Sequence, residues 1–215
     1  DVHALGSAAS ADRHAVRLGG LAPATRYFYA AGHASCPPSA PGDPADHFTT
    51  APAAGTSAPL RVWVVGDSGT GGSAQRAVRD AMLAETASAP IDLFVHVGDM
   101  AYDDGTTAEL TSNFFDVYAD VLRSVPVWPA IGNHEGHTAD SATQSGPYYD
   151  AYVLPFDGSA GGEPSGTEAY YAFDWGDVHF VVLDSYDSPR ASSGAMLTWL
   201  EADLASTDAR WIIAF

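Results

Sequence analysis

The sequence reads LFVHVGDMAY from residue 93 to residue 102. This is an apolar run that ends in a glycine and an aspartate, with a tyrosine three positions after the aspartate. A short apolar run bounded by glycine is typical of a buried β-strand, and sites in open α/β sheets form outside the carboxyl ends of the strands. Asp99 and Tyr102 are therefore predicted to lie at a sheet edge, where a carboxylate needs hydrogen-bond partners or a cation.

Two further segments repeat this arrangement. The first is VWVVGDSG at residues 62–69, and the second is VPVWPAIGNHE at residues 125–135. The intervals between the three segments each have the length of one strand–helix–strand unit. Asp67, Asn133 and His134 are therefore predicted to reach the same sheet edge as the motif in the central segment.

From Leu60 onward, strand-like and helix-like segments alternate, which favours a layered α/β domain. The strands are predicted from apolar runs between turn residues, and the helices from apolar residues at helical spacing. After the strand at 62–65, the predicted elements are a helix over 73–87, a strand over 91–97, a helix over 108–123, a strand over 125–131, a polar loop over 135–147, antiparallel strands over 169–174 and 178–184, a helix over 195–204, and a strand from Trp211.

The N-terminal region has a different pattern. Short strand-like stretches at 15–18, 26–32 and 47–50 are separated by turn residues, which favours a β-sandwich. Residues 1–52 provide only about half of the roughly 100 residues that such a sandwich needs. Residues 53–59 are rich in Pro, Ala, Gly and Ser and are predicted to be a linker.

Composition excludes several classes of partner. The formal net charge is -18, and all nine basic residues are arginine. Nucleic acid and anionic membrane surfaces are excluded because both require a basic face. A small phosphoester substrate remains compatible with this charge, since bound cations would dominate the local field. Cys36 is the only cysteine, so the sequence offers no internal disulfide and no zinc–thiolate site.

The two ends of the sequence are both expected to be cut. The chain begins with Asp1 rather than methionine and stops inside the apolar run 211–215. The lack of a signal peptide is therefore uninformative. No run of about 18 apolar residues is present, so no membrane-spanning helix is predicted.

The residue types at the three strand ends suit hard metal ions. Oxygen donors from Asp, Tyr and Asn side chains favour such cations. Two neighbouring ions can clamp a phosphoryl group and lower the pKa of a bound water, and His134 would be placed to donate a proton to the leaving group. Each ligand also has a structural interpretation, since Asp67 can cap the following helix and Asp99 with Tyr102 can form a structural pair. The coincidence of three such strand ends favours the metal interpretation.

The motifs GDSG, GDMAY and GNHE resemble those of the calcineurin-like metallophosphoesterases. The tyrosine of GDMAY makes this motif similar to that of their purple acid phosphatase branch. Residues 170–184 and 199–204 resemble middle segments of that family. Residues 18–29 resemble the end of the fibronectin type III-like domain that precedes the catalytic domain in larger members. The resemblance implies a layered α/β metallophosphoesterase sandwich, C-terminally truncated, at 60–215, preceded by part of a fibronectin type III-like β-sandwich at 1–52.

The resemblance also implies roles for individual residues. Asp67 and Tyr102 would bind a ferric ion, and the tyrosine would give a purple charge-transfer colour. Asp99 would bridge this ion to a second, divalent metal (Fe2+, Zn2+ or Mn2+), which Asn133 would bind. His134 would assist protonation of the leaving group of a phosphomonoester. An extracytoplasmic or secreted location is implied as well.

The resemblance further implies three ligand histidines that this sequence does not contain. With four of seven expected protein ligands, the chain is expected to bind metal weakly and to turn over poorly. One alternative is a non-catalytic binding or adhesion module with an incomplete metal site. A remote alternative is a serine hydrolase that uses Ser68 of GDSG, although the α/β pattern contradicts the all-β fold of trypsin-like proteases and no His and Asp pair for Ser68 is evident.

The other histidines have less specific interpretations. His96 and His179 lie within predicted strands, so packed or hydrogen-bonded positions are expected. His137 follows the third motif and is a candidate for contact with a substrate. The remaining four belong to the N-terminal region and are expected at the surface: His3, His14, His33 and His47.

Overall fold

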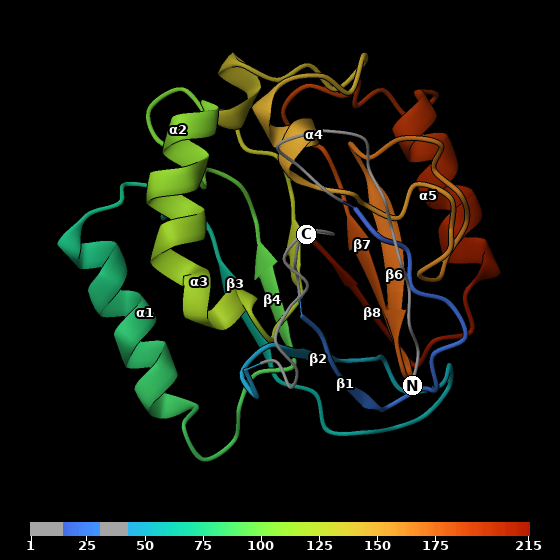
Figure 1. The fold of residues 1–215 in the computed structure, drawn as a ribbon. Helices are drawn as coiled ribbons and strands as arrows, with labels where there is room; N and C mark the ends of the chain where they lie inside the picture. The colour runs from blue at the N-terminus through green and yellow to red at the C-terminus, as the bar shows by residue number, and fades with distance from the viewer. Residues whose placement is uncertain (1–14, 31–42) are drawn as a thin grey trace, which may run out of the picture.

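The computed structural model describes residues 15–30 and 43–215 (Figure 1). Three of the histidines predicted at the surface and the single cysteine lie outside the described residues: His3, His14, His33 and Cys36. In the part of the chain that the structure describes, no helix has the length and apolar character needed to cross a membrane.

Three sheets organise the described residues. The first is an antiparallel pair and the second is entirely parallel, whereas the third combines an antiparallel and a parallel pairing. In order, their strands are β1 (Arg26–Phe28) and β2 (His47–Thr49); β3 (Val62–Val65), β4 (Leu93–His96) and β5 (Val127–Pro129); and β6 (Tyr171–Trp175), β7 (Val178–Val182) and β8 (Trp211–Ala214). Every strand predicted from Leu60 onward is present, although several are shorter than predicted.

Helices cover the outer faces of the second and third sheets (Figure 1). The helical elements are α1 (Ser73–Glu85), α2 (Thr107–Glu109), a π-helical turn (Leu110–Phe115), α3 (Asp116–Leu122), a 3-10 turn (Glu135–His137), α4 (Pro147–Ala151) and α5 (Ala195–Ser206). Helices α1 and α3 lie on one side of the molecule and α5 on the other, with the two larger sheets between them. The layered α/β architecture predicted for this region is therefore confirmed.

Stacked aromatic rings hold these layers together. Trp128 of β5 stacks on Phe173 of β6 with ring centroids 3.8 Å apart, which joins the second sheet to the third. Phe94 of β4 stacks on Trp63 of β3 at 4.5 Å and meets Tyr118 of α3 edge-on at 5.3 Å. Offset and edge-on pairs of this kind add to the stabilisation from burying the rings. The carboxyl ends of β3, β4 and β5 are thereby fixed side by side.

The helix predicted over residues 108–123 is observed as one continuous helical segment with an irregular centre. It begins with a capping box between Thr106 and Glu109 and passes through the π-helical turn before α3. The π turn contains Asn113, whose Nδ2 donates hydrogen bonds to the backbone carbonyl oxygens of Gly69 and Tyr102, both at 3.0 Å. The extra residue in the turn therefore places a side chain that connects the first two motifs, a common use of π turns near functional sites.

The N-terminal region differs from the prediction at one point. Residues 15–18 were predicted to be a strand, but their backbone is irregular and exposed. The two predicted strands that follow are observed as β1 and β2. Arg123, directly after α3, donates from its Nε to Asp46 at 2.7 Å and accepts at its carbonyl oxygen from the Tyr29 hydroxyl at 3.0 Å. The β1–β2 hairpin is therefore attached to the α/β region by polar contacts rather than by a shared core.

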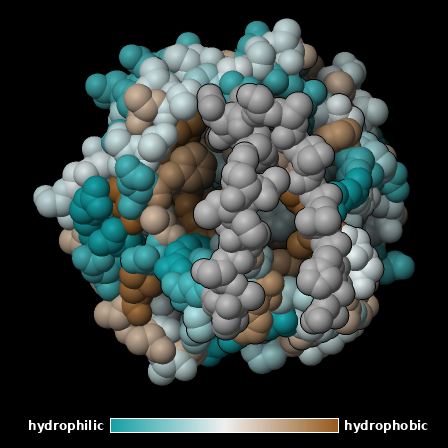
Figure 2. All heavy atoms as spheres, in the orientation of Figure 1, coloured by the Kyte–Doolittle hydropathy of each residue, from teal (hydrophilic) through white to brown (hydrophobic). Residues whose placement is uncertain are grey.

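One face of the molecule exposes apolar side chains. Figure 2 shows hydrophobic atoms on either side of the grey spheres near the centre of the view, with hydrophilic residues further out. β8 runs across the centre of the same view in Figure 1, and its side chains Trp211, Ile212 and Ile213 are 57%, 48% and 39% exposed. Within the described residues β8 pairs with β7 alone. This part of the third sheet is thus only partly covered by the residues that the structure describes.

His96 and His179 are fully buried and hydrogen-bonded, which confirms the prediction made for them. The ring of His179 lies between two carboxylates, with Nδ1 2.7 Å from Asp174 and Nε2 2.8 Å from Asp203. Burial alone lowers the pKa of His179, but the hydrogen bonds and charges of these two carboxylates outweigh burial and raise its pKa above the ordinary value. The ring, with a carboxylate at each nitrogen, is thus held by β6 on one side and α5 on the other.

We expect His179→Gln to lower the free energy of unfolding by about 3–5 kcal/mol near pH 6, the range typical of breaking a buried ion pair. Because the folded-state pKa is raised, this contribution is fully present below the ordinary histidine pKa of about 6.5 and is lost as pH rises through the raised value. Urea unfolding of the wild type and of His179→Gln from pH 5.5 to pH 9 measures this pH-dependent contribution to stability. His137→Gln, at an exposed histidine beside Asp104, is the control. A deficit that stays constant with pH would contradict a charged His179.

Candidate metal centre

The two aspartates of the motifs follow neighbouring parallel strands in an unusual backbone conformation. Asp67 and Asp99 have φ angles of 51° and 59°, in the left-handed region that non-glycine residues seldom adopt. Strain of this kind concentrates at functional sites and persists only where the surroundings hold it. The pairing of Val65 with His96, and of His96 with Pro129, aligns the three strand ends, so the loops that follow meet at one edge.

Tyr102 connects the two carboxylates. Its hydroxyl lies 3.2 Å from Oδ1 of Asp67 and 3.3 Å from Oδ2 of Asp99, so one phenol proton serves two acceptors. Burial and the charges of Asp99 and Asp67 raise the pKa of Tyr102 well above its ordinary value. The phenol therefore stays protonated while the carboxylates have no cation between them, and a metal ion that bound here would have to displace this proton.

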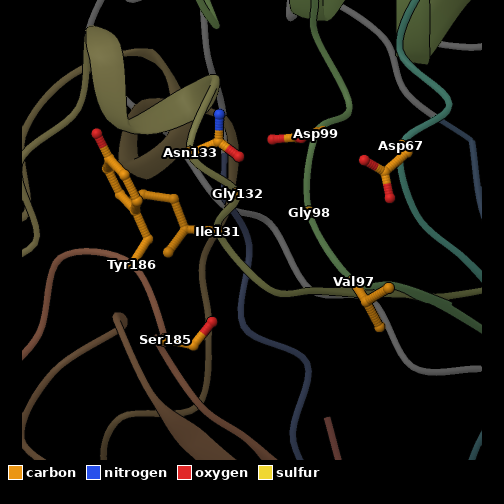
Figure 3. A pocket seen from close by; sticks show the side chains of 9 residues that line it. All are labelled: Asp67, Val97, Gly98, Asp99, Ile131, Gly132, Asn133, Ser185 and Tyr186. Atoms are coloured by element: carbon orange, nitrogen blue, oxygen red, sulfur yellow. The ribbon is translucent and has the colours of Figure 1, made fainter. Parts of the chain in front are cut away.

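Asn133 opens onto the same pocket as the two aspartates. The pocket has a volume of about 270 Å3, close to the lower end of the roughly 300–1,000 Å3 typical of small-molecule sites. Figure 3 shows the side chains of Asp67, Asp99 and Asn133 along one side of it. The complete lining is Asp67, Val97, Gly98, Asp99, Ile131, Gly132, Asn133, Ser185 and Tyr186. The structure thus brings together all four predicted metal ligands, three in the pocket wall and Tyr102 in contact with two of them.

The donor set fits hard cations. It combines two carboxylates, a phenol and an amide oxygen, which are suitable ligands for iron, zinc or manganese. No arginine or histidine forms an ion pair with Asp67 or Asp99 among the described residues, so their charges are not neutralised by side chains there. In the same described ranges no group of three or more His, Cys, Asp or Glu side chains could hold a metal. The predicted site does not meet that condition because two of its four ligands, Tyr102 and Asn133, are not of these residue types.

Glu135 fixes the loop that carries Asp99, a role that the sequence analysis missed. Its side chain is fully buried, and its two carboxylate oxygens accept hydrogen bonds from the backbone N–H groups of Asp99, Met100, Ala101 and Gly132 at 2.8–3.0 Å. Burial raises the pKa of Glu135, and the backbone hydrogen bonds offset part of that effect. The sequence did contain a signal for this role, because Glu135 directly follows an apolar strand and a glycine-containing turn.

The three loops approach one another so closely that two motif glycines leave no room for a side chain. A Cβ on Gly69 would lie 2.0 Å from the carbonyl carbon of Met100. A Cβ on Gly132 would lie 2.3 Å from both the backbone nitrogen and Oδ1 of Asp99. The glycines of GDSG and GNHE therefore allow the backbone of each neighbouring loop to pack directly on the GDMAY loop.

His134 lies at the edge of the site. Its backbone N–H donates to Oδ1 of Asp99 at 3.1 Å, and its ring packs edge-on against Tyr102 with centroids 4.3 Å apart. Because a carbonyl oxygen only accepts, ring Nδ1 donates to the backbone oxygen of Asp103, 2.5 Å away. This contact raises the pKa of His134, with burial opposing it and nearby acidic charges adding to it. Nε2 has no hydrogen-bond partner within the described residues and is available to a ligand.

His137 lies further out. Its ring centroid is 5.3 Å from that of His134, and its Nδ1 lies 3.3 Å from Oδ1 of Asp104. It does not line the pocket. The contact of His137 with a substrate therefore stays a prediction, and its position outside the pocket wall does not support it.

Ser68 has a histidine partner, but not the arrangement of a serine hydrolase. Its Oγ lies 2.8 Å from Nε2 of His96 and accepts from the Tyr118 hydroxyl at 3.3 Å. Burial lowers the pKa of His96 to about 3, and its Nδ1 has no hydrogen-bond partner among the described residues. A triad needs a histidine of near-neutral pKa oriented by a carboxylate. The structure therefore supports the preference against Ser68 as a nucleophile.

Comparison with known proteins identifies the family. The family model described as calcineurin-like phosphoesterase matches residues 60–215. Over 94% of its length this chain is 28% identical to purple acid phosphatase 15 and 27% identical to purple acid phosphatase 23 of Arabidopsis thaliana, and it covers 40% and 47% of those two proteins. A shorter match, at 28% identity over 53% of this chain and 20% of the relative, is to the probable inactive purple acid phosphatase 9 of the same plant.

A solved structure shows the same fold. The purple acid phosphatase PPD1 from yellow lupin (Lupinus luteus) seeds superposes with a TM-score of 0.59 at 20% sequence identity, covering 78% of this chain and 32% of that one. The chain spans less than half the length of the curated relatives it matches. The predicted metallophosphoesterase α/β fold and the resemblance to the purple acid phosphatase branch are therefore confirmed, and this chain belongs to the calcineurin-like phosphoesterase family.

Proposed function

We propose that this chain contributes to the dinuclear metal centre of a phosphomonoester hydrolase of the acid phosphatase type. The observation that carries the proposal is the convergence of Asp67, Tyr102 and Asp99 at aligned strand ends, with Asn133 in the same pocket wall. The relatives support phosphoester hydrolysis in general. The substrate would be a small phosphoester, since the pocket is small and the rest of its lining consists of backbone and the side chains of Val97, Ile131, Ser185 and Tyr186.

Each residue has a defined part in this proposal. Asp67 and Tyr102 would hold a ferric ion, Asn133 a divalent ion (Fe2+, Zn2+ or Mn2+), and Asp99 would lie between them. When bound, the two cations would supply Lewis-acid stabilisation of the phosphoryl oxygens and an acidified water. His134, whose Nε2 is free of partners in the described region, would give a proton to the leaving-group oxygen. Tyr102 would lose its proton to the solvent when the ferric ion binds.

The wider organisation is also proposed. Residues 60–215 would form the catalytic region, 53–59 a linker, and 1–52 part of a fibronectin type III-like β-sandwich that includes β1 and β2. We infer an extracytoplasmic or secreted location from the resemblance. With four metal ligands available, we expect the affinity for metal to be weaker than that of a full ligand set, and turnover to be impaired.

The incomplete ligand set also favours a second candidate function. With fewer ligands than a dinuclear centre requires, the chain would act as a non-catalytic binding or adhesion module. The similarity to a purple acid phosphatase described as probably inactive is compatible with this alternative. The two candidates differ in the uptake of metal and in metal-dependent hydrolysis.

Reconstitution with Fe3+ and Zn2+ separates them. With both ions in excess, which offsets the weak affinity, the phosphatase proposal predicts close to two metals per chain by elemental analysis, a purple absorption band, and slow hydrolysis of 4-nitrophenyl phosphate that requires both metals. Tyr102→Phe is expected to remove the band, because the phenolate would be its source. Tyr170→Phe is the control, since Tyr170 is buried against Trp199, away from the motifs. Absence of metal uptake and of hydrolysis at every metal ratio would favour the binding module.

A further inference from the structure

The wall of the pocket opposite the motif carboxylates comes from the loop between β7 and α5. Ser185 and Tyr186 line the pocket together with Asp67, Asp99 and Asn133. Figure 3 shows the tyrosine ring beside Ile131 and the serine side chain across the opening from Asp99. Neither residue belongs to the three motifs, and the metal centre does not use them. They are therefore free to act on another part of a ligand.

The backbone of this loop is firmly held. Asp184 is fully buried, and its carboxylate accepts from the N–H groups of Tyr186, Asp187 and Ser188 at 2.8–2.9 Å. Asp187 in turn accepts from the N–H of Ser141 at 2.8 Å, which ties the loop to the segment after the GNHE motif. A binding wall built on such a fixed backbone requires little ordering when a ligand enters.

In contrast with the backbone, the hydroxyl groups of the two side chains are not engaged by the fold. No described residue forms a hydrogen bond with the hydroxyl of Ser185 or Tyr186, and Tyr186 remains 43% exposed. The tyrosine ring rests on Gly136, where a Cβ would lie 2.1 Å from a ring carbon. Gly136 is two residues from His134, so the ring is supported by the same turn that carries the proposed proton donor.

The chemistry of the pocket is divided between its walls. One side presents the oxygen donors of Asp67, Asp99 and Asn133, and the other presents Ile131, Tyr186 and the hydroxyl of Ser185. A phosphoryl group would lie against the oxygen donors and their cations, so the organic group of the ester would lie against the second wall. Aromatic faces favour stacking with planar rings.

We propose that Ser185 and Tyr186 form the subsite for the organic group of the substrate and select phosphomonoesters of planar aromatic alcohols over small aliphatic ones. Tyr186 stacks on the aromatic ring, and Ser185 donates a hydrogen bond to an ester or phosphoryl oxygen. This inference rests on the proposed function, because it needs the phosphoryl group to be held by the metal centre.

Binding of non-hydrolysable analogues to the metal-loaded chain tests it. Isothermal titration calorimetry with inorganic phosphate, phenylphosphonate and ethylphosphonate gives the three affinities. We expect wild type to prefer phenylphosphonate over ethylphosphonate by roughly 3–10-fold, as one aromatic pair provides. Tyr186→Ala should abolish that preference and leave inorganic phosphate unchanged within about twofold, whereas Tyr186→Phe should retain it. Phe156→Ala, at a similarly exposed aromatic residue (46%) outside the pocket lining, is the control.

Each contrary outcome identifies which proposal fails. If inorganic phosphate binds and Tyr186→Ala keeps the full preference for phenylphosphonate, the subsite is wrong and the metal centre stands. If wild type shows no such preference, the subsite is wrong as well. If the metal-loaded chain binds no inorganic phosphate, the proposed function fails and the subsite fails with it.

Discussion

Asp99→Asn is expected to eliminate measurable binding of the second metal and any metal-dependent hydrolysis. Asp99 is 8% exposed, and its two carboxylate oxygens face different partners: Tyr102 through Oδ2 and the N–H of His134 through Oδ1. It is thus the carboxylate placed between the GDSG side and the GNHE side of the site. Losing even an outer-shell partner costs about 10–100-fold in metal affinity, so we expect the loss of the carboxylate proposed as the bridge to exceed that range.

The asparagine substitution is chosen so that the fold survives. Asparagine tolerates the left-handed conformation that Asp99 adopts, and it preserves the shape of the side chain. Titration with Zn2+ and Fe3+, followed by elemental analysis, measures the effect. Asp208→Asn is the matched control, because Asp208 is exposed beyond α5, at the opposite end of the third sheet from the pocket. Equal metal content in wild type and Asp99→Asn would show that the motifs do not form the metal centre.

Glu135→Gln is expected to lower the free energy of unfolding by about 2–5 kcal/mol and to weaken metal binding, although Glu135 is not a proposed ligand. The carboxylate accepts from four backbone N–H groups of the GDMAY and GNHE loops. A glutamine amide has one acceptor oxygen, so its NH2 group would face backbone donors. Each buried donor left without an acceptor costs roughly 1–3 kcal/mol.

Urea unfolding of the metal-free chain and metal titration of the same variant measure the two effects. Glu201→Gln, on the exposed side of α5, controls for the change in net charge. We expect the loss of stability to be present already in the metal-free protein, because the four hydrogen bonds form without any cation. A variant with wild-type stability and reduced metal binding would instead make Glu135 a direct ligand and would contradict the role derived from its contacts.

Much of the fold could be predicted from local sequence patterns. The strand at Val62–Val65 was predicted with its observed bounds, and the helices at 73–87 and 195–204 are present with ends that differ by about two residues. These patterns depend on residues close together in the chain, since apolar periodicity and bounding glycines act within one element. The irregular backbone at 15–18 was mispredicted because a strand also requires a partner, which local propensity does not provide.

The set of candidate metal ligands was also accessible from the sequence. Parallel strands end at the same edge of their sheet, so residues that follow three such strands meet there whatever the details of packing. The Tyr102 hydroxyl is accordingly within hydrogen-bonding distance of both Asp67 and Asp99. The chemical nature of the donors was equally evident, because residue types are read directly from the sequence.

Only the tertiary structure revealed how the site is supported and what faces it. The buried carboxylate of Glu135, the contact of Ser68 with His96, and the position of Tyr186 opposite the aspartates all join segments that are distant in sequence. Such contacts depend on the register of the strands and on the path of long loops, and a difference of a few ångströms decides whether a hydrogen bond exists. The sequence by itself determined which groups gather at the sheet edge, because strand–helix–strand connections make successive strands run parallel, whereas packing between distant segments decided their partners.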